Sequence, residues 1–256
     1  MSDISDNKMS LTSHLEELRK RLMRSLIAAF IAFGLCYNFR EWLFEILTRP
    51  LVESLPDNSH IIFTSLPEAF FNYLKISFVA GLIVSSPYIL YQIWKFISPG
   101  LYQSEKKYIA PFVISSTVLF IGGVLFGYFL ALPPAFRFFL EFSTDFIKPM
   151  LTLREYLSLS LKLLLAFGVV FEMPVFIFFL AKIGVVDSKM LAKQRKYAIL
   201  LIFIIAALLT PSPDAFSQTL MAIPMMVLYE FGIFVAKWGE KRKTKKEKGD
   251  MVEEKA

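Results

Sequence analysis

The chain has 256 residues, of which 55% are hydrophobic and 16% aromatic, and its mean hydropathy is +0.54. Its apolar residues form long uncharged runs between short charged segments, a pattern typical of a polytopic membrane protein that excludes an ordinary soluble domain. The net charge of +6 does not indicate a nucleic-acid-binding protein, because the basic residues lie at the ends of the runs.

The first expected element is a short amphipathic helix over residues 10–22, which leads into a membrane-spanning helix over residues 21–39. Leucines recur at helical spacing along the first of these and form one apolar stripe. Ser13 and Glu16 have the spacing of a capping box at its start. The apolar run resembles a signal peptide, but bulky and charged residues stand at 39–42 in place of a small-residue cleavage site, which predicts a retained helix.

Five further spans are predicted from apolar runs, over residues 71–96, 108–132, 157–183, 197–210 and 216–237. The run at 197–210 is short for a bilayer crossing, and Pro211 follows it. The second, fourth and sixth spans run in the same direction, and each has an internal proline, at Pro87, Pro174 and Pro224. Each proline removes a backbone hydrogen bond and favours a kink, so we expect an all-α bundle of six spans with a concave, bowl-like surface. The alternative is that prolines are simply frequent in membrane helices.

The distribution of charge predicts the orientation of the chain. Lysines and arginines concentrate before the first span, after the second, after the fourth and after the sixth. The positive-inside rule therefore places these segments and both termini in the cytoplasm. The six-span domain is expected over residues 1–238, and the charged residues 239–256 are expected to form a disordered tail.

The outer side of the predicted bundle carries two apolar segments, at 40–70 and 133–156. The second is rich in phenylalanine and predicts a short amphipathic helix that rests on the membrane surface or caps the bundle. Its phenylalanines are Phe136, Phe138, Phe139, Phe142 and Phe146.

The sequence contains no enzyme or metal-site motif. It lacks a Gly-x-Ser-x-Gly, a His-Glu-x-x-His and a phosphate loop. Cys36 is the only cysteine, which excludes an intrachain disulfide and a cysteine-based metal site. The two histidines, His14 and His60, lie on opposite sides of the membrane in the predicted topology. The chain is therefore not expected to be an enzyme, and no metal or other cofactor is expected.

Two carboxylates in the basic cytoplasmic segments are candidates for binding a cationic ligand. Glu17 lies off the leucine stripe, four residues before Arg21, and Glu105 precedes Lys106 in the loop after the second span. A carboxylate can accept a guanidinium group in two parallel hydrogen bonds. The alternatives are an exposed helix ion pair for Glu17 and a solvated loop charge for Glu105.

Glu172 is a third candidate, because it lies inside a predicted span, two residues before Pro174. A carboxyl group in the membrane is costly and indicates a functional site, and the alternative is a buried, hydrogen-bonded structural acid. A proton-coupled secondary transporter that uses Glu172 is a rival function, although the internal repeats typical of that class are absent. An intramembrane hydrolase is disfavoured by the missing nucleophile–base pair.

Four separated motifs resemble, in order, those of the TatC family, the polytopic subunit of the twin-arginine protein translocase. They are HLEELRKRL at 14–22, FISPGLYQSEK at 96–106, FGVVFEMP at 167–174 and LLTPSPDAFSQ at 208–218. The resemblance covers residues 10–238. The last motif departs slightly from the family pattern, because Ser212 separates Pro211 from Pro213 where adjacent prolines are expected.

The resemblance implies a receptor for signal peptides with paired arginines, and a core assembly platform of an oligomeric translocase that exports folded proteins across the bacterial cytoplasmic membrane. The family's signal-binding positions match Glu17, Arg19, Phe96 and Glu105. Its expected partners are the single-helix subunits TatA and TatB, signal peptides of folded cargo, and membrane lipid. The family's contacts with those subunits fall near Thr210, Asp214 and Gln218. The family's embedded glutamate on the concave surface matches Glu172, and its outer-loop proline matches Pro50.

Overall fold

The protein is all-α, as the sequence predicted. The computed structural model describes residues 11–53, 62, 64–97, 109–141, 152–210 and 215–253. Its elements in chain order are α1 (Leu11–Tyr37), α2 (Arg40–Val52), α3 (Glu68–Ile97), α4 (Ile109–Phe126), the π-helical turn η3 (Gly127–Ala131), α5 (Leu132–Leu140), α6 (Leu153–Val170), α7 (Met173–Lys182), α8 (Ser188–Lys193), α9 (Arg195–Leu209) and α10 (Ala215–Glu253).

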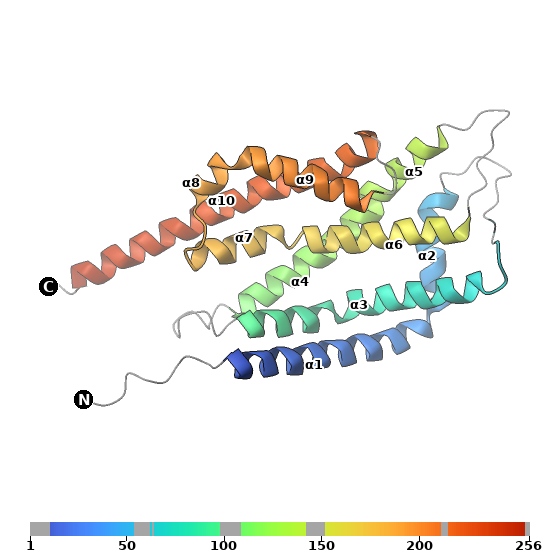
Figure 1. The fold of residues 1–256 in the computed structure, drawn as a ribbon, viewed down its shortest axis with the longest axis horizontal. Coiled ribbons are helices and arrows are strands. Elements are labelled where there is room, and N and C mark those ends of the chain that lie inside the picture. Colours follow the sequence, from blue (N-terminus) through green and yellow to red (C-terminus); the bar gives the residue numbers. More distant parts are fainter. Residues whose placement is uncertain are drawn as a thin grey trace.

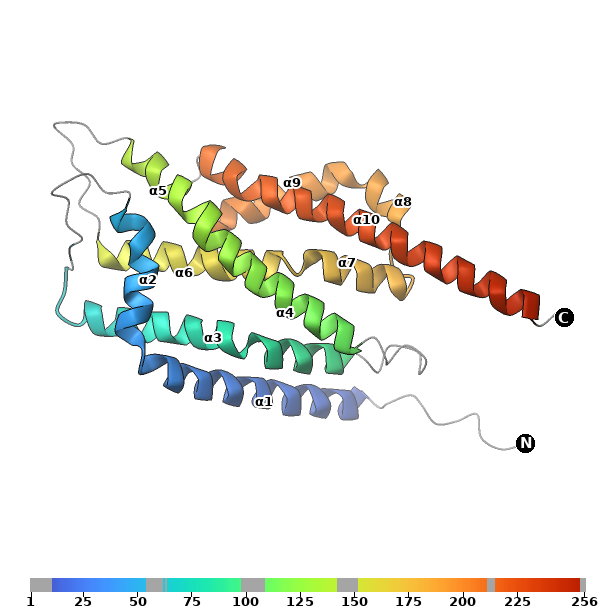
Figure 2. The same ribbon diagram turned by 180° about the vertical axis from the view of Figure 1, so that it is seen from behind.

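The long helices lie side by side in one bundle (Figures 1 and 2). The α1–α3 pair forms one edge, α9 and α10 form the other, and α6 and α7 lie between them. Helix α4 crosses this layer and contacts both α3 and α6. The start of α1 and the end of α10 lie at the same end of the molecule.

Helix α1 is one continuous helix of 27 residues, not an amphipathic helix followed by a distinct span. No proline interrupts the sequence from Leu11 to Tyr37, so nothing local ends the first helix before the apolar run begins. The chain then bends by 85° into α2, which occupies part of the expected outer segment. Pro50, expected in a loop, lies buried inside α2.

Two tyrosine hydroxyl groups hold α2 against the bundle. Tyr128 donates a hydrogen bond to the carbonyl of Ile46 at 2.7 Å, and Tyr156 donates to the carbonyl of Leu47 at 2.5 Å. Leu47 and Leu51 of α2 are buried in the core. The outer segment therefore contains an integral part of the fold.

Glu68, at the start of α3, connects two elements at the outer end of the bundle. Its buried carboxylate accepts hydrogen bonds from the backbone N–H groups of Thr64 at 2.7 Å and Ser65 at 3.3 Å, and from that of Arg154 in the first turn of α6 at 2.9 Å. The sequence interpretation missed this group, although Ser65 and Glu68 have the spacing of a capping box.

The third predicted span continues beyond its expected end. A π-helical turn at Gly127–Ala131 joins α4 to α5, and the apolar helix extends over Ala110–Phe138. Phe136 is 5% exposed and belongs to the core, so the prediction of a separate surface helix is wrong for this part of the segment. The side chain of Phe139, and Phe142 and Phe146, lie outside the described residues.

Two glycines permit close helix crossings. A Cβ atom at Gly81 would lie 2.6 Å from the backbone nitrogen of Phe33, where α3 crosses α1. A Cβ atom at Gly123 would lie 2.4 Å from the carbonyl oxygen of Phe167, where α4 crosses α6. Gly123 and Gly127 are four residues apart, a spacing that permits such close approach of membrane helices.

The prolines of the other spans differ in their effect. Pro174 lies in the first turn of α7, and the predicted 157–183 span is interrupted between Val170 and Met173. Pro87 and Pro224, in contrast, lie inside the continuous helices α3 and α10. Helix α10 continues to Glu253, whereas a disordered tail was expected from residue 239. The lysines and glutamates of that segment are good helix formers, so they can extend a helix that has already begun.

Four helices in the described part of the chain are long and apolar enough to cross a membrane. They cover Glu68–Ile97, Ala110–Phe138, Leu153–Lys182 and Ala215–Trp238, and the bent α1–α2 pair would make a fifth. Helix α9 has 15 residues, a length of about 22 Å, against a hydrocarbon core of about 30 Å. The six-span count therefore stays a prediction.

Candidate functional site

The first part of the candidate site lies where the start of α1 packs against the end of α3. The rings of His14 and Phe96 stack with centroids 4.5 Å apart and planes inclined by 18°. Two turns further along α1, Nη1 of Arg21 donates to the buried side-chain oxygen of Gln92 at 3.4 Å. These contacts bring Glu17 and Phe96, two of the four expected signal-binding residues, to the same end of the α1–α3 pair.

Glu17 forms an ion pair with Arg21. Its Oε1 atom accepts a hydrogen bond from Nε of Arg21 at 2.9 Å and a second from Nη2. The side chains of Arg21 and Glu17 are only 12% and 24% exposed, whereas both partners of the adjacent Glu16–Lys20 pair are mostly exposed. The ion pair considered from the sequence is thus present but partly buried, which makes Glu17 different from an ordinary surface carboxylate.

The other two expected signal-binding residues are Arg19 and Glu105. Arg19 lies on α1 with an exposed side chain. Glu105 lies outside the described residues. The structure therefore brings together Glu17 and Phe96, through His14, Arg21 and Gln92, three residues to which the sequence interpretation gave no part in binding.

The second part of the candidate site is a polar cluster inside the bundle, at the interruption between α6 and α7. The carboxyl group of Glu172 lies near the hydroxyl group of Ser116 on α4. Ser116 is fully buried and accepts a hydrogen bond from the indole N–H of Trp94 on α3 at 2.8 Å. Oε1 of Glu172 is buried and has no hydrogen-bond partner among the described residues. The cluster thus joins α3, α4 and the interruption between α6 and α7, and Oε1 of Glu172 is its atom without a hydrogen-bond partner among the described residues.

Trp94 and Ser116 were missed as members of this cluster. In the sequence Trp94 has the position of an ordinary aromatic residue near a helix end, but in the structure it is 6% exposed and its ring packs on Phe112. A serine in an apolar run gives no signal of its own, because it can satisfy its hydroxyl group on the preceding turn of its own helix.

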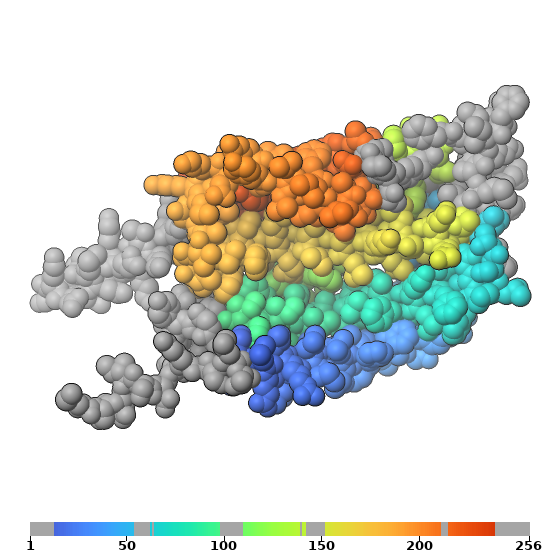
Figure 3. All heavy atoms as spheres, in the orientation of Figure 1, coloured from blue at the N-terminus to red at the C-terminus, as the bar shows by residue number. Residues whose placement is uncertain are grey.

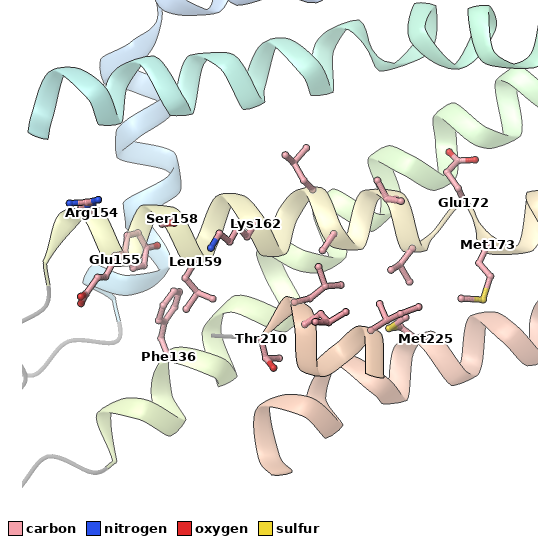
Figure 4. Close-up of a pocket in the computed structure, with 18 of the residues that line it drawn as sticks. Phe136, Arg154, Glu155, Ser158, Leu159, Lys162, Glu172, Met173, Thr210 and Met225 are labelled. Carbon is pink, nitrogen blue, oxygen red and sulfur yellow. The ribbon is translucent and has the colours of Figure 1, made fainter. Parts of the chain in front are cut away.

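Glu172 also contributes to the wall of a large cavity of about 1350 Å³ (Figure 4). Figure 4 shows Arg154 and Glu155 at one end of the row of lining residues and Glu172 and Met173 at the other. Most of the wall between them is apolar and comes from α6, α7 and α9. Of the three helices expected to form the concave surface, α3 contributes no lining residue, so the cavity is bounded mainly by α6, α7 and α9.

The expected partner-binding residues fall, in sequence, between the end of α9 and the first turns of α10. Thr210 lines the same cavity as Glu172, and its hydroxyl group donates to the carbonyl of Ala206 at 2.9 Å. Gln218 is partly exposed in the first turns of α10, and Asp214 lies outside the described residues. Phe216 stacks on Phe138 of α5 with centroids 4.2 Å apart, which places the start of α10 against α5.

Comparison with known proteins shows strong similarity along almost the whole chain. Residues 13–224 match the family model described as Sec-independent protein translocase protein (TatC). The TatC protein of Desulforapulum autotrophicum is 48% identical over 94% of this chain and 90% of its own length. The TatC protein of Aquifex aeolicus is 44% identical over 92% of this chain and 98% of its own length. The TatC protein of Escherichia coli is 39% identical over 91% of this chain and 90% of its own length. A crystal structure of the twin-arginine translocase receptor TatC aligns with a TM-score of 0.80 at 43% identity, over 89% of this chain and 99% of that one.

Proposed function

Because this chain belongs to the TatC family of Sec-independent protein translocase proteins, we propose that it is the receptor for signal peptides with paired arginines and the core on which the translocase assembles. It works in the bacterial cytoplasmic membrane with both termini in the cytoplasm. The basic segments predicted to be cytoplasmic support this orientation. The cargo is a folded protein, so only its signal peptide needs to be recognised here.

The receptor proposal rests mainly on the partly buried carboxylate of Glu17, which has one oxygen paired and one oxygen available. Arg21 binds only one oxygen of this carboxylate, Oε1, and no hydrogen bond to Oε2 occurs within the described part of the chain. Burial of the pair reduces competition from water, so a further guanidinium at Oε2 would form a charge-assisted hydrogen bond stronger than one at the surface. Arg21 also fixes the carboxylate in place and lowers the entropy lost on binding.

Phe96 and Glu105 complete the proposed receptor site. A guanidinium group stacks well on an aromatic ring, and Phe96 stands at the end of α3, next to the loop that contains Glu105. Glu17 and Glu105 would each take one arginine of the motif. Arg19, exposed on the same helix as Glu17, is proposed to hydrogen-bond to backbone carbonyls of the signal peptide.

The assembly surface is proposed to lie at the cavity and the α9–α10 turn. Thr210 and Glu172 line one cavity, and Gln218 and Asp214 lie close in sequence at the adjoining helix start. Polar side chains on a mostly apolar wall are suited to hydrogen bonding with a transmembrane helix of a partner. We assign this surface to the single helices of TatA and TatB.

Removal of either carboxylate should weaken binding of a twin-arginine signal peptide. We expect Glu17→Ala and Glu105→Ala each to raise the Kd by at least about tenfold, because a hydrogen bond between charged groups contributes about 1.5–3 kcal/mol. The measurement is titration of a fluorescent signal peptide against the purified protein in lipid nanodiscs.

Glu16→Ala is the matched control for Glu17→Ala. Glu16 is the neighbouring residue, carries the same charge and forms an equally local pair with Lys20, but that pair is exposed. Its removal should change the Kd by less than about threefold. Equal binding by wild type and by both Glu17→Ala and Glu105→Ala, with normal thermal stability, would refute the assignment.

A further inference from the structure

The large cavity has a charged end and an apolar body. Lys162 lines it, with Arg154 and Glu155 near the start of α6, so the formal charge at this end is +1. Figure 4 shows the ammonium group of Lys162 pointing toward the start of α6, away from Glu172. Among the described residues Lys162 takes part in no ion pair, and Figure 4 shows the carboxylate of Glu155 lying apart from it.

The position of Lys162 along α6 requires an explanation. It lies nine residues after Leu153, about 13 Å along the helix axis, in a helix long and apolar enough to cross the membrane. A lysine at that depth extends toward the interface to keep its charge close to polar groups. Neither acid that lines the cavity, Glu155 or Glu172, forms an ion pair with Lys162, so an anion that arrives with an apolar body would supply the missing counter-charge.

The apolar body of the cavity fits such a ligand. Beyond Lys162 the wall continues through Leu165, Val169 and Phe176, with Leu208 on α9 opposite. Val169 is 65% and Leu208 80% exposed, values that would be costly in water and indicate contact with hydrocarbon. Figure 3 shows atoms of α6 between those of α9 and α3 on this face of the molecule.

We infer that this cavity is a binding site for one anionic phospholipid, with the phosphate at Lys162 and Arg154 and an acyl chain along α6 toward Phe176. The phosphate supplies the anion that Lys162 lacks, and the chain covers the exposed apolar wall. A zwitterionic lipid has the same acyl chains but no net negative charge, so it should bind more weakly. The lipid fills the cavity while no partner helix is docked there, and a cavity that accepts only a helix would leave the purified protein indifferent to lipid charge.

The test is competition between two lipids for the purified full-length protein. The delipidated protein is incubated with equal amounts of phosphatidylglycerol and phosphatidylcholine of identical acyl chains, and the retained lipids are counted by native mass spectrometry. The expected preference for phosphatidylglycerol is about fivefold, the effect of one basic group near an anionic lipid. It should disappear in Lys162→Gln and persist in Lys162→Arg.

Lys75→Gln is the matched control, because Lys75 is also an exposed lysine near the outer end of a span but does not line the cavity. It should keep the full preference. A wild-type protein without preference, or a Lys162→Gln protein that retains it, would overturn the inference. If Lys162→Gln does not fold, a phosphatidylglycerol with a photoreactive acyl chain tests the wild type alone. Labelling should fall within residues 165–176, and labelling confined to other helices would contradict the site.

Discussion

Replacement of Glu172 by alanine is expected to reduce export of a folded cargo by more than about tenfold, whereas Glu172→Gln keeps most of the export. The carboxyl group reaches Ser116 on one side and has a buried, unpartnered Oε1 on the other. An ionised carboxylate with an unpartnered oxygen in the membrane is strongly disfavoured, so we expect the group to act as a neutral hydrogen-bonding side chain. Glutamine keeps a donor and an acceptor at nearly the same size, and alanine keeps neither. Each lost hydrogen bond costs about 1–3 kcal/mol.

The measurement is export of a reporter cargo by each variant, together with signal-peptide binding and protein level. Binding should stay normal in Glu172→Ala, since the α1–α3 contact lies on other helices. Glu230→Ala is the matched control, because Glu230 is also an acid in a membrane-spanning helix but forms an exposed ion pair with Arg195. If Gln is as defective as Ala, the charge itself is required. If both variants export normally, Glu172 has no part in assembly or transport.

Replacement of Gly123 by alanine is expected to destabilise the folded protein strongly. The added Cβ atom would lie 2.4 Å from the carbonyl oxygen of Phe167 and 2.8 Å from Cγ of Phe171. A backbone carbonyl cannot turn aside, so α4 and α6 must separate at their crossing. Overpacking of this kind costs about 1–3 kcal/mol, despite the better helix propensity of alanine. Unfolding by detergent titration, followed by circular dichroism, measures the loss.

Gly122→Ala is the matched control for Gly123→Ala. The two glycines are adjacent in α4, but a Cβ atom at Gly122 would meet nothing within 4 Å. The control should unfold at the same detergent fraction as wild type or at a slightly higher one. Equal stability of the two variants would mean that the α4–α6 crossing is looser than the structure indicates.

The helical class and the places of the helices were predictable because they depend on local sequence. Uncharged runs identified the helices that span the membrane, and Pro174 correctly marked the interruption before α7. The direction of a short helix was not predictable. Helix α2 turns 85° away from α1, since Tyr128 and Tyr156, distant in sequence, hold its carbonyl groups.

The candidate site was predictable only for residues with an unusual chemical position. Glu17 and Glu172 were identified because a carboxylate stood in a basic segment or in an apolar run. The residues that contact these two carboxylates were harder to predict from the sequence. Arg21 was considered from its spacing, but Gln92 and Ser116 are ordinary polar residues whose importance comes from helix packing. These contacts depend on which helices, distant in sequence, pack against each other. Sequence periodicity predicts where a helix lies but not which helix it packs against.

The most direct test of the account compares binding of a signal peptide with Arg-Arg and of the same peptide with Lys-Lys. Lysine keeps the positive charge but lacks the planar group that binds a carboxylate with two parallel hydrogen bonds. If Glu17 and Glu105 form the receptor site, the Arg-Arg peptide should bind at least about tenfold more tightly to the wild-type protein in nanodiscs. The advantage should shrink in Glu17→Ala and stay unchanged in Glu16→Ala. Equal affinity of the two peptides for the wild-type protein would contradict the proposed receptor function.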